Sequence, residues 1–293
     1  MSPDFELSAT PQEYTGRKFS HSSMSTWRRC RMRYKWSYID NYAPPSGIGQ
    51  LRGSAGHAAL GEWYGNGQDD DAAIQAAADL YTIAESERNQ SLGDDWDLLD
   101  MILRRYFDWA RANDNFQEII SIEQKFEIKI GGIPVIGYID GVVRSHNGSI
   151  WLLEHKFNKQ VSVSHIDLDP QMSLYLLAAY SLGIDVKGIL YNVIRVAEKG
   201  KASVNPVERR MVYRNIEGLQ FIEKETYLQL EEMVKFHAEG GIVYRNPTRD
   251  CSWDCSFYNV CASLNDNGDA QSVLNSIPIV QREVDKAQEK GEV

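Results

Sequence analysis

A short apolar stretch of the chain, WLLEHKFNK, carries an acid and a base two positions apart. Glu154 and Lys156 therefore project from the same face of the strand that this stretch predicts. A second acid, Asp140, lies in the otherwise apolar stretch VIGYIDGVV. Asn147-Gly148 predicts a tight turn between these strands, so Asp140 and Glu154 can lie side by side across the ladder.

This set of residues suits metal-assisted hydrolysis of a phosphodiester. Two adjacent carboxylates repel each other and are tolerated best when a divalent cation lies between them. A neighbouring lysine can orient or deprotonate a water molecule, or stabilise developing negative charge. The alternative is a solvated ion pair between Glu154 and Lys156, with Asp140 in a turn. Apolar residues on both faces of these strands disfavour that alternative, because such strands have no solvated face to spare.

The four cysteines form the second chemical group. Cys251, Cys255 and Cys261 follow a C-x3-C-x5-C pattern, and Cys30 lies more than two hundred residues upstream. Four thiolates suffice for one iron–sulfur cluster or one zinc ion. The one-plus-three division favours the cluster, because zinc sites more often pair two short Cys-x2-Cys knuckles. Buried cysteines without a ligand are the remaining alternative.

Three further polar residues are ambiguous when each is considered alone. His57 lies in SAGHAALGEWY, which predicts a helix, and a lone helical histidine is more often a core or surface residue than a ligand. Gln171 and Tyr175 are four positions apart and share one face of another predicted helix. By themselves they form a polar edge on an apolar helix.

Composition and charge narrow the function classes only weakly. The chain has 293 residues, of which 43% are hydrophobic and 25% charged, which is typical of a soluble globular protein. A net charge of −10 disfavours an extended nucleic-acid surface, although local basic clusters such as RRCRMRYK can still bind. Neither a secretory signal nor a membrane-spanning run is evident, so we expect a cytoplasmic protein (the host cytoplasm, if phage-encoded) and no membrane partner. A reducing compartment favours metal-binding cysteines over disulfides.

Hydrophobic periodicity predicts an α/β organisation. Residues 118–156 alternate with period two and contain Gly131-Gly132 and Asn147-Gly148, which predicts an antiparallel meander of three strands. Residues 187–196 predict a fourth strand. Helical spacing predicts helices over 70–90, 95–112, 169–183 and 215–241. The second of these has an apolar stripe made of Leu99, Ile102, Leu103, Tyr106, Phe107 and Ala110.

The ends of the chain differ in composition from its centre. We expect a flexible N-terminal arm over residues 1–20, one domain over 21–264 and a polar tail over 265–293. The sheet would span about 118–196, and the cysteine segment 245–264. A helix beginning at Ser22 or Ser23 would place four residues on one face, namely Trp27, Cys30, Tyr34 and Tyr38.

Taken in order, these motifs resemble the RecB-like branch of the PD-(D/E)xK nuclease superfamily in its iron–sulfur form. AddB-type helicase–nucleases, CRISPR-associated four-cysteine exonucleases and small phage exonucleases share that form. The resemblance extends from about Ser22 to Cys261. The matching segments are SSMSTWRRCRMRY with Cys30, GSAGHAALGEWY with His57, GYIDGVV with Asp140, LLEHK with Glu154 and Lys156, QMSLY with Gln171 and Tyr175, and the group Cys251, Cys255 and Cys261.

The resemblance implies a role for each matched residue. Metal ligands would be His57, Asp140, Glu154 and the backbone carbonyl of His155. Lys156 would position the attacking water, with Asp140 and Glu154 as its catalytic partners. Gln171 and Tyr175 would contact the DNA backbone, and the four cysteines would hold a 4Fe-4S cluster.

The resemblance also implies a fold and a function. The fold would be a restriction-endonuclease-like core with a mixed sheet flanked by helices, whose N- and C-terminal helical parts are joined by the cluster. The activity would be that of a Mg²⁺- or Mn²⁺-dependent DNA exonuclease acting on single strands or duplex ends. By analogy alone, it would serve phage or mobile-element recombination or repair with a strand-annealing recombinase. A structural zinc, a non-catalytic accessory factor and an RNA-processing nuclease are the alternatives.

Overall fold

The computed structural model describes residues 16–159, 164–197, 205–266 and 268–280. The described chain divides into two compact units. The first unit is built from Ser46–Phe126 and Gly137–Ile222, and the second from the stretches 16–45, 127–136 and 223–280. Both units are assembled from segments far apart in the sequence, and the single domain expected over residues 21–264 stays a prediction.

A mixed sheet forms the centre of the fold. Its strands are β1 (Phe19–Ser20), β2 (Phe116–Ile130), β3 (Ile133–Ser145), β4 (Ile150–Asn158), β5 (Val186–Arg195) and β6 (Val207–Val212). The strand order is β1-β3-β4-β5-β6, and β2 pairs with β3. The β3–β4 and β5–β6 pairs are antiparallel, whereas β4 and β5 are parallel. The predicted mixed α/β fold with a central sheet flanked by helices is confirmed.

Glycines at the turns allow the predicted meander to form. Gly131 and Gly132 connect β2 to β3 with φ angles of 57° and 82°, and Gly148 has a φ of 84° in the next turn. These angles are in the left-handed region, which glycine adopts at no steric cost. Sequence periodicity did not predict β6, because only its end residues, Val207 and Val212, are apolar and buried.

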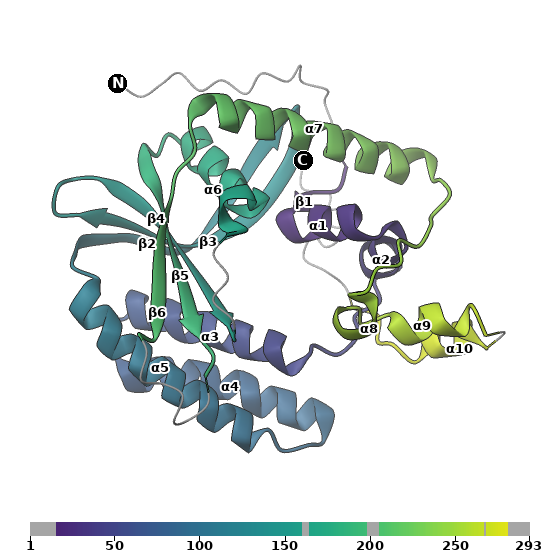
Figure 1. Ribbon diagram of the computed structural model, residues 1–293, viewed down its shortest axis with the longest axis horizontal. Coiled ribbons are helices and arrows are strands. Elements are labelled where there is room, and N and C mark those ends of the chain that lie inside the picture. Colours follow the sequence, from purple (N-terminus) through teal and green to yellow (C-terminus); the bar gives the residue numbers. More distant parts are fainter. Residues whose placement is uncertain (1–15, 160–163, 198–204, 267, 281–293) are drawn as a thin grey trace. The chain divides into compact units, whose positions relative to one another are not determined.

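Helices of the first unit cover both faces of its strands (Figure 1). They are α3 (Ile48–Gly65), α4 (Asp70–Arg88), α5 (Gly93–Asn113) and α6 (Pro170–Ser181), with the 3-10 turn η2 (Ile166–Leu168) before α6. One hydrophobic core joins α3, α4 and α5 to inward residues of the sheet such as Val143, Leu153 and Leu190. The apolar stripe predicted for α5 is confirmed, since all six of its residues are buried.

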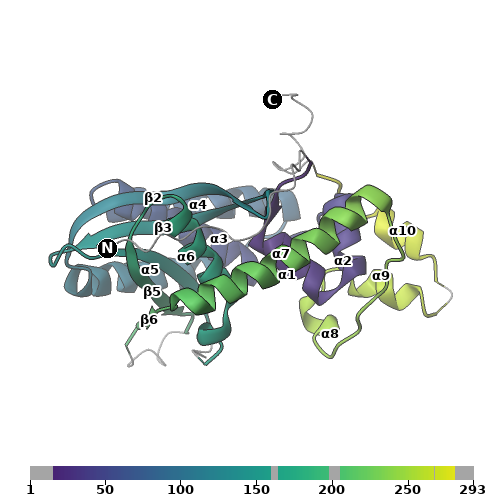
Figure 2. The ribbon, with the colours of Figure 1, turned by 90° about the horizontal axis from the view of Figure 1, so that it is seen from above.

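The second unit contains short helices and part of a long one. They are α1 (His21–Arg29), α2 (Arg31–Tyr34), the π-helix η1 (Lys35–Ile39), α8 (Cys251–Asp254), α9 (Tyr258–Ser263), α10 (Ala270–Asn275) and the residues of α7 (Ile216–Glu239) that follow Ile222. Helices α9 and α10 lie side by side (Figure 2). A small core forms here around Trp36, Phe257 and Val260.

The chain ends and the first helix differ from the sequence prediction. Phe19 is fully buried in β1, within the predicted arm of residues 1–20, of which residues 1–15 lie outside the described part of the chain. The first helix is capped by Ser20 rather than by Ser22 or Ser23, and extended backbone at Cys30 ends it. The predicted polar tail contains α10, whose Leu274 packs in the small core. In the part of the chain that the structure describes, no helix is both long and apolar enough to cross a membrane.

Candidate active site

Pairing of β3 with β4 brings two acids together. Gly141 lies opposite Leu153, and Val142 opposite Leu152. One position further along this antiparallel register, Asp140 comes opposite Glu154. The two carboxylates are therefore neighbours, in agreement with the spacing of each acid from the turn between the strands.

Asp140 is held in its ionised form by two histidines. Its Oδ2 accepts a hydrogen bond from the backbone N–H of His155 at 2.8 Å, and its Oδ1 lies 3.3 Å from Nδ1 of His57. Burial acts to raise the pKa of Asp140, but the contacts with His155 and His57 outweigh it and hold this pKa below its ordinary value. Asp140 is therefore a permanently charged ligand candidate.

Glu154 has the opposite electrostatic environment. Its side chain is 1% exposed, and its Oε2 makes no hydrogen bond with any described residue. Burial, followed by the neighbouring charge of Asp140, raises the pKa of Glu154 to about 7. An unpaired buried carboxylate oxygen is costly, and a divalent cation beside Asp140 would satisfy it.

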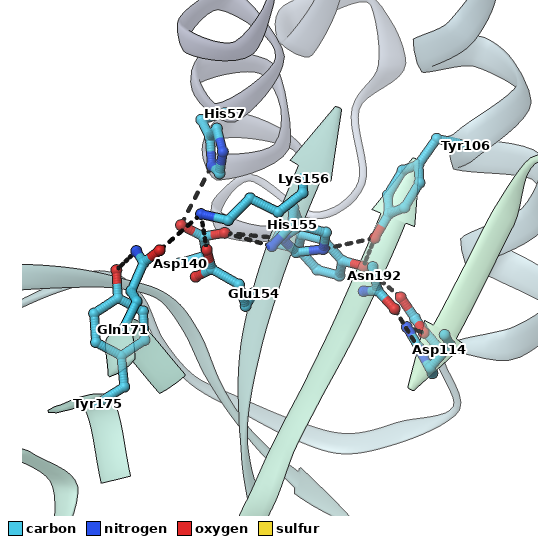
Figure 3. A network of polar contacts seen from close by, with 12 residues as sticks. His57, Tyr106, Asp114, Asp140, Glu154, His155, Lys156, Gln171, Tyr175 and Asn192 are labelled. Carbon is cyan, nitrogen blue, oxygen red and sulfur yellow. Dashed lines mark hydrogen bonds and ion pairs between the residues drawn. The ribbon is translucent and has the colours of Figure 1, made fainter. Parts of the chain in front are cut away.

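Lys156 connects the acids to helix α6 (Figure 3). Its Nζ contacts Oε1 of Glu154 and donates to Oε1 of Gln171 at 3.1 Å. Nε2 of Gln171 in turn donates to the hydroxyl of Tyr175 at 2.7 Å. Burial acts to lower the pKa of Lys156, but the charge of Glu154 outweighs it and raises this pKa. Lys156 is therefore a cationic hydrogen-bond donor in this arrangement.

The start of α6 positions Gln171. The side chain of Asp169 caps the helix by accepting from the backbone N–H of Gln171 at 2.8 Å, and Pro170 occupies the first helical position. Gln171 and Tyr175 are four residues apart and face the same side of this helix. The ring of Tyr175 packs edge-on against Phe126 at 5.9 Å, which holds the outer end of this polar row.

The acids, the lysine and the α6 residues thus converge from separate elements of the first unit. A family model that describes the PD-(D/E)XK nuclease superfamily matches residues 18–262. The chain belongs to this superfamily. No curated protein matches the sequence. The crystal structure of SSO0001 aligns with 86% of this chain and 89% of its own at 14% identity, with a TM-score of 0.37.

Membership of the PD-(D/E)XK superfamily identifies the protein as a nuclease whose relatives use divalent metal ions. A group of potential ligands fits such an ion in this structure. One ligand atom from each of His57, Glu123 and Asp140 lies within 4.8 Å of the others. The unpaired oxygen of Glu154 adds a fourth candidate. The sequence indicated the other three residues as metal-ligand candidates but not Glu123, because Glu123 is one of the outward residues of the predicted alternating strand.

The side chain of His155 belongs to a buried network on the opposite face of β4 from Glu154 (Figure 3). Its Nε2 is 2.8 Å from the hydroxyl of Tyr106, which is 2.7 Å from the hydroxyl of Tyr64. Tyr64 donates to Asp114, and Asp114 pairs with Arg209. Burial lowers the pKa of His155, so the neutral imidazole is favoured. No short-range sequence pattern indicates this network, because its members come from four different elements.

A close approach between α3 and β4 positions His57. A Cβ atom built on Gly56 would lie 2.3 Å from the ring of Phe157, so only glycine fits at this point. The ring of Phe157 also contacts the imidazole of His57, with the ring centroids 6.0 Å apart. Glycine at position 56 therefore brings the histidine-bearing turn of α3 against the strand that carries Glu154.

We expect Gly56→Ala to destabilise the fold and to reduce cleavage. The added methyl group must displace Phe157 or the helix, and such overpacking costs about 1–3 kcal/mol. The displacement also moves His57 away from Asp140. Thermal unfolding and a nuclease assay check both effects. Gly53→Ala is the matched control, because a Cβ there meets open space and the helix gains propensity. Equal stability of the two variants would contradict the proposed close fit.

The four cysteines come together in the second unit. They all line one cavity of about 310 Å³, which also has Arg29, Arg33 and Arg245 at its wall. Cys251 comes from the start of α8 and Cys261 from α9, whereas Cys30 ends α1. Burial raises the pKa of the Cys261 thiol, and the nearby Cys255 acts in the same direction. The sequence did not predict this shared cavity, although it predicted that the four thiols act together.

Proposed function

We propose that the protein is a Mg²⁺- or Mn²⁺-dependent exonuclease that hydrolyses phosphodiester bonds of DNA. The observation that carries this proposal is the unpaired, buried Oε2 of Glu154 beside the ionised Asp140. His57 approaches the same acids, and the protonated Lys156 lies next to them. A buried pair of acids with a spare acceptor and an adjacent cationic donor fits metal-assisted phosphodiester hydrolysis.

The residues have separate roles in this proposal. His57, Asp140, Glu154 and the backbone carbonyl of His155 would hold the divalent ion, which supplies Lewis-acid stabilisation and a nucleophilic water at neutral pH. Lys156 orients the attacking water and donates to the oxygen on which negative charge develops. Gln171 and Tyr175 contact the phosphodiester backbone, and the hydrogen bond between them fixes the direction of both side chains.

An end-labelled digestion tests this function. Single- and double-stranded DNA labelled at the 5′ or the 3′ end would be incubated with Mg²⁺ or Mn²⁺, beside RNA strands of matched sequence. We expect stepwise shortening of DNA from an end, and no shortening by Asp140→Asn. Preferential cleavage of RNA would instead support an RNA-processing enzyme. Binding of DNA without cleavage in either metal would support an accessory factor.

We further propose that the four cysteines hold a 4Fe-4S cluster. A zinc ion places its thiolates about 3.8 Å apart, given Zn–S bonds of about 2.3 Å. A 4Fe-4S cluster is larger than a single ion and takes four thiolates around it. All four cysteines line one cavity of about 310 Å³, which suits four thiolates around a cluster.

Replacement of Cys30 by serine is expected to lower the melting temperature and remove visible absorbance. Cys30 supplies the thiol that would tie α1 to the segment bearing Cys251, Cys255 and Cys261. Loss of this ligand should destabilise the fold rather than act directly on catalysis. Absorbance spectra, iron content and thermal unfolding of anaerobically purified protein would be compared with Ser252→Ala, an exposed control in the same segment. A colourless, zinc-containing wild-type protein would refute the cluster.

A further inference from the structure

Strand β2 contains a residue with unusual backbone geometry, Glu123. Its φ angle is +48°, in the left-handed region that residues other than glycine, asparagine and aspartate rarely adopt. Ile122, just before this residue, packs on the core, and Phe126 and Ile128 after it are buried. Such strain persists only where the surrounding structure enforces it.

The strained backbone directs the Glu123 side chain to the two residues already placed at the acid site. A carboxylate oxygen of Glu123, a ring nitrogen of His57 and a carboxylate oxygen of Asp140 all lie within 4.8 Å of one another. Cγ of Glu123 lies 3.5 Å from the position that a Cβ on Gly61 would occupy. Because Gly61 lies one turn after His57 on α3, the same helix face borders both side chains.

Nothing in the described protein compensates the charge of Glu123 fully. Its side chain is exposed and makes no hydrogen bond or ion pair with any described residue, and its electrostatic neighbours are Asp140 and His57. Burial and the charge of Asp140 both raise the pKa of Glu123, and His57 only partly opposes them. Glu123 and Asp140 are thus two neighbouring acids, with the imidazole of His57 beside them.

A separate observation points to a cation at this place. Glu154, across the ladder from Asp140, is buried with its Oε2 unpartnered. An octahedral Mg²⁺ ion with oxygen ligands at about 2.1 Å separates neighbouring ligands by about 3 Å and opposite ones by about 4.2 Å. The spacing of His57, Glu123 and Asp140 is compatible with those separations.

We infer that Glu123 is a ligand of the divalent cation held by His57 and Asp140. The inference rests on the proposed metal-dependent function and adds a carboxylate from β2 to the expected ligand set. With it, the proposed ligand set comprises the carboxylates of Glu123, Asp140 and Glu154, the imidazole of His57 and the backbone carbonyl of His155, which leaves one position of an octahedral ion for water or a phosphate oxygen. The left-handed backbone at position 123 would then hold this carboxylate beside the cation.

Direct Mn²⁺ binding in the absence of DNA tests the inference. Isothermal titration calorimetry, or the electron paramagnetic resonance signal of free Mn²⁺, would compare wild type with Glu123→Gln, which keeps the size of the side chain. We expect the Kd for Mn²⁺ to rise about tenfold or more. Glu118→Gln is the matched control, since it removes an exposed acid of the same strand that pairs with Arg144. Its Kd should stay within about twofold of wild type.

Asp140→Asn separates failure of the inference from failure of the proposed function. If Asp140→Asn abolishes Mn²⁺ binding and Glu123→Gln does not change it, the role of Glu123 is refuted while the metal site stands. If neither substitution changes Mn²⁺ binding, the metal site itself is refuted. Weakened binding in both variants, with Glu118→Gln unchanged, supports the inference.

A glycine variant distinguishes loss of Mn²⁺ binding from loss of folding. Glycine adopts a φ of +48° without strain, so Glu123→Gly should melt no lower than wild type. It should nevertheless bind Mn²⁺ as weakly as Glu123→Gln. A Glu123→Gly protein that melts at or above the wild-type temperature and retains wild-type Mn²⁺ affinity would overturn the assignment.

Discussion

Replacing Lys156 with alanine is expected to lower DNA cleavage by about 10³-fold or more and to leave the protein folded. Nζ of Lys156 contacts Glu154 and Gln171, so it lies between the acids and the residues proposed to contact the DNA backbone. No other described lysine makes these contacts, and a truncated side chain cannot donate to the water or to the developing charge. Single-turnover cleavage of end-labelled DNA at saturating Mn²⁺ measures the loss.

The fold should survive this substitution for an electrostatic reason. Removing one partner of a buried ion pair is usually destabilising, because the other charge is left uncompensated. The pKa of Glu154 is already raised to about 7, so this carboxyl can take up a proton when Lys156 is absent. Circular dichroism and thermal unfolding would confirm that the variant is folded.

The matched control is Lys159→Ala, which removes an equal charge from an exposed residue three positions later. Its cleavage rate should remain close to that of wild type. Lys156→Arg is also informative, because a planar guanidinium cannot reproduce the geometry of the ammonium group. Full activity of Lys156→Ala would refute the proposed catalytic role of Lys156.

Replacing Glu154 with glutamine is expected to abolish cleavage and, in the absence of metal, to stabilise the protein above pH 7. The carboxyl has an ordinary pKa near 4.5 when unfolded and a pKa of about 7 when folded. Between these values the folded protein binds the extra proton, so rising pH favours unfolding of the wild type. Glutamine has no such titration.

The size and pH range of this effect follow from the same shift. The stability of Glu154→Gln relative to wild type should increase from about pH 4.5, and level off above about pH 7 at about 3 kcal/mol. Thermal unfolding in chelator at several pH values measures the difference. Adding Mn²⁺ should reverse the order at pH 8, because only the wild type gains the full ligand set. A pH-independent difference between the proteins would contradict the buried, protonated state of Glu154.

Local patterns in the sequence determined the central part of the site. Alternation with period two and the glycine turns set the register of β3 and β4, and that register made Asp140 and Glu154 neighbours. The two-residue spacing put Lys156 on the same face as Glu154. Helical spacing similarly placed Gln171 and Tyr175 together. Each of these predictions depends only on the backbone geometry of a few neighbouring residues.

Features that depend on distant segments were decided by the tertiary structure alone. The side chain of Glu123 lies beside Asp140 and His57, and its left-handed backbone occurs in a strand for which the sequence predicts regular geometry. The hydrogen bonds among His155, Tyr106 and Tyr64 join a strand to two helices that lie far apart in the sequence.

The same distinction explains the remaining differences in the fold. The break in the first helix at Cys30 accompanies packing of its thiol in the cavity shared with the C-terminal segment, rather than any helix-breaking residue. Each compact unit is assembled from segments far apart in the sequence, so composition does not reveal a boundary between the units. The sequence by itself therefore determined which residue types meet along each strand and helix, since dihedral preferences and periodicity act locally. Only the tertiary structure decided which elements pack together, because burial and long-range contacts set that choice.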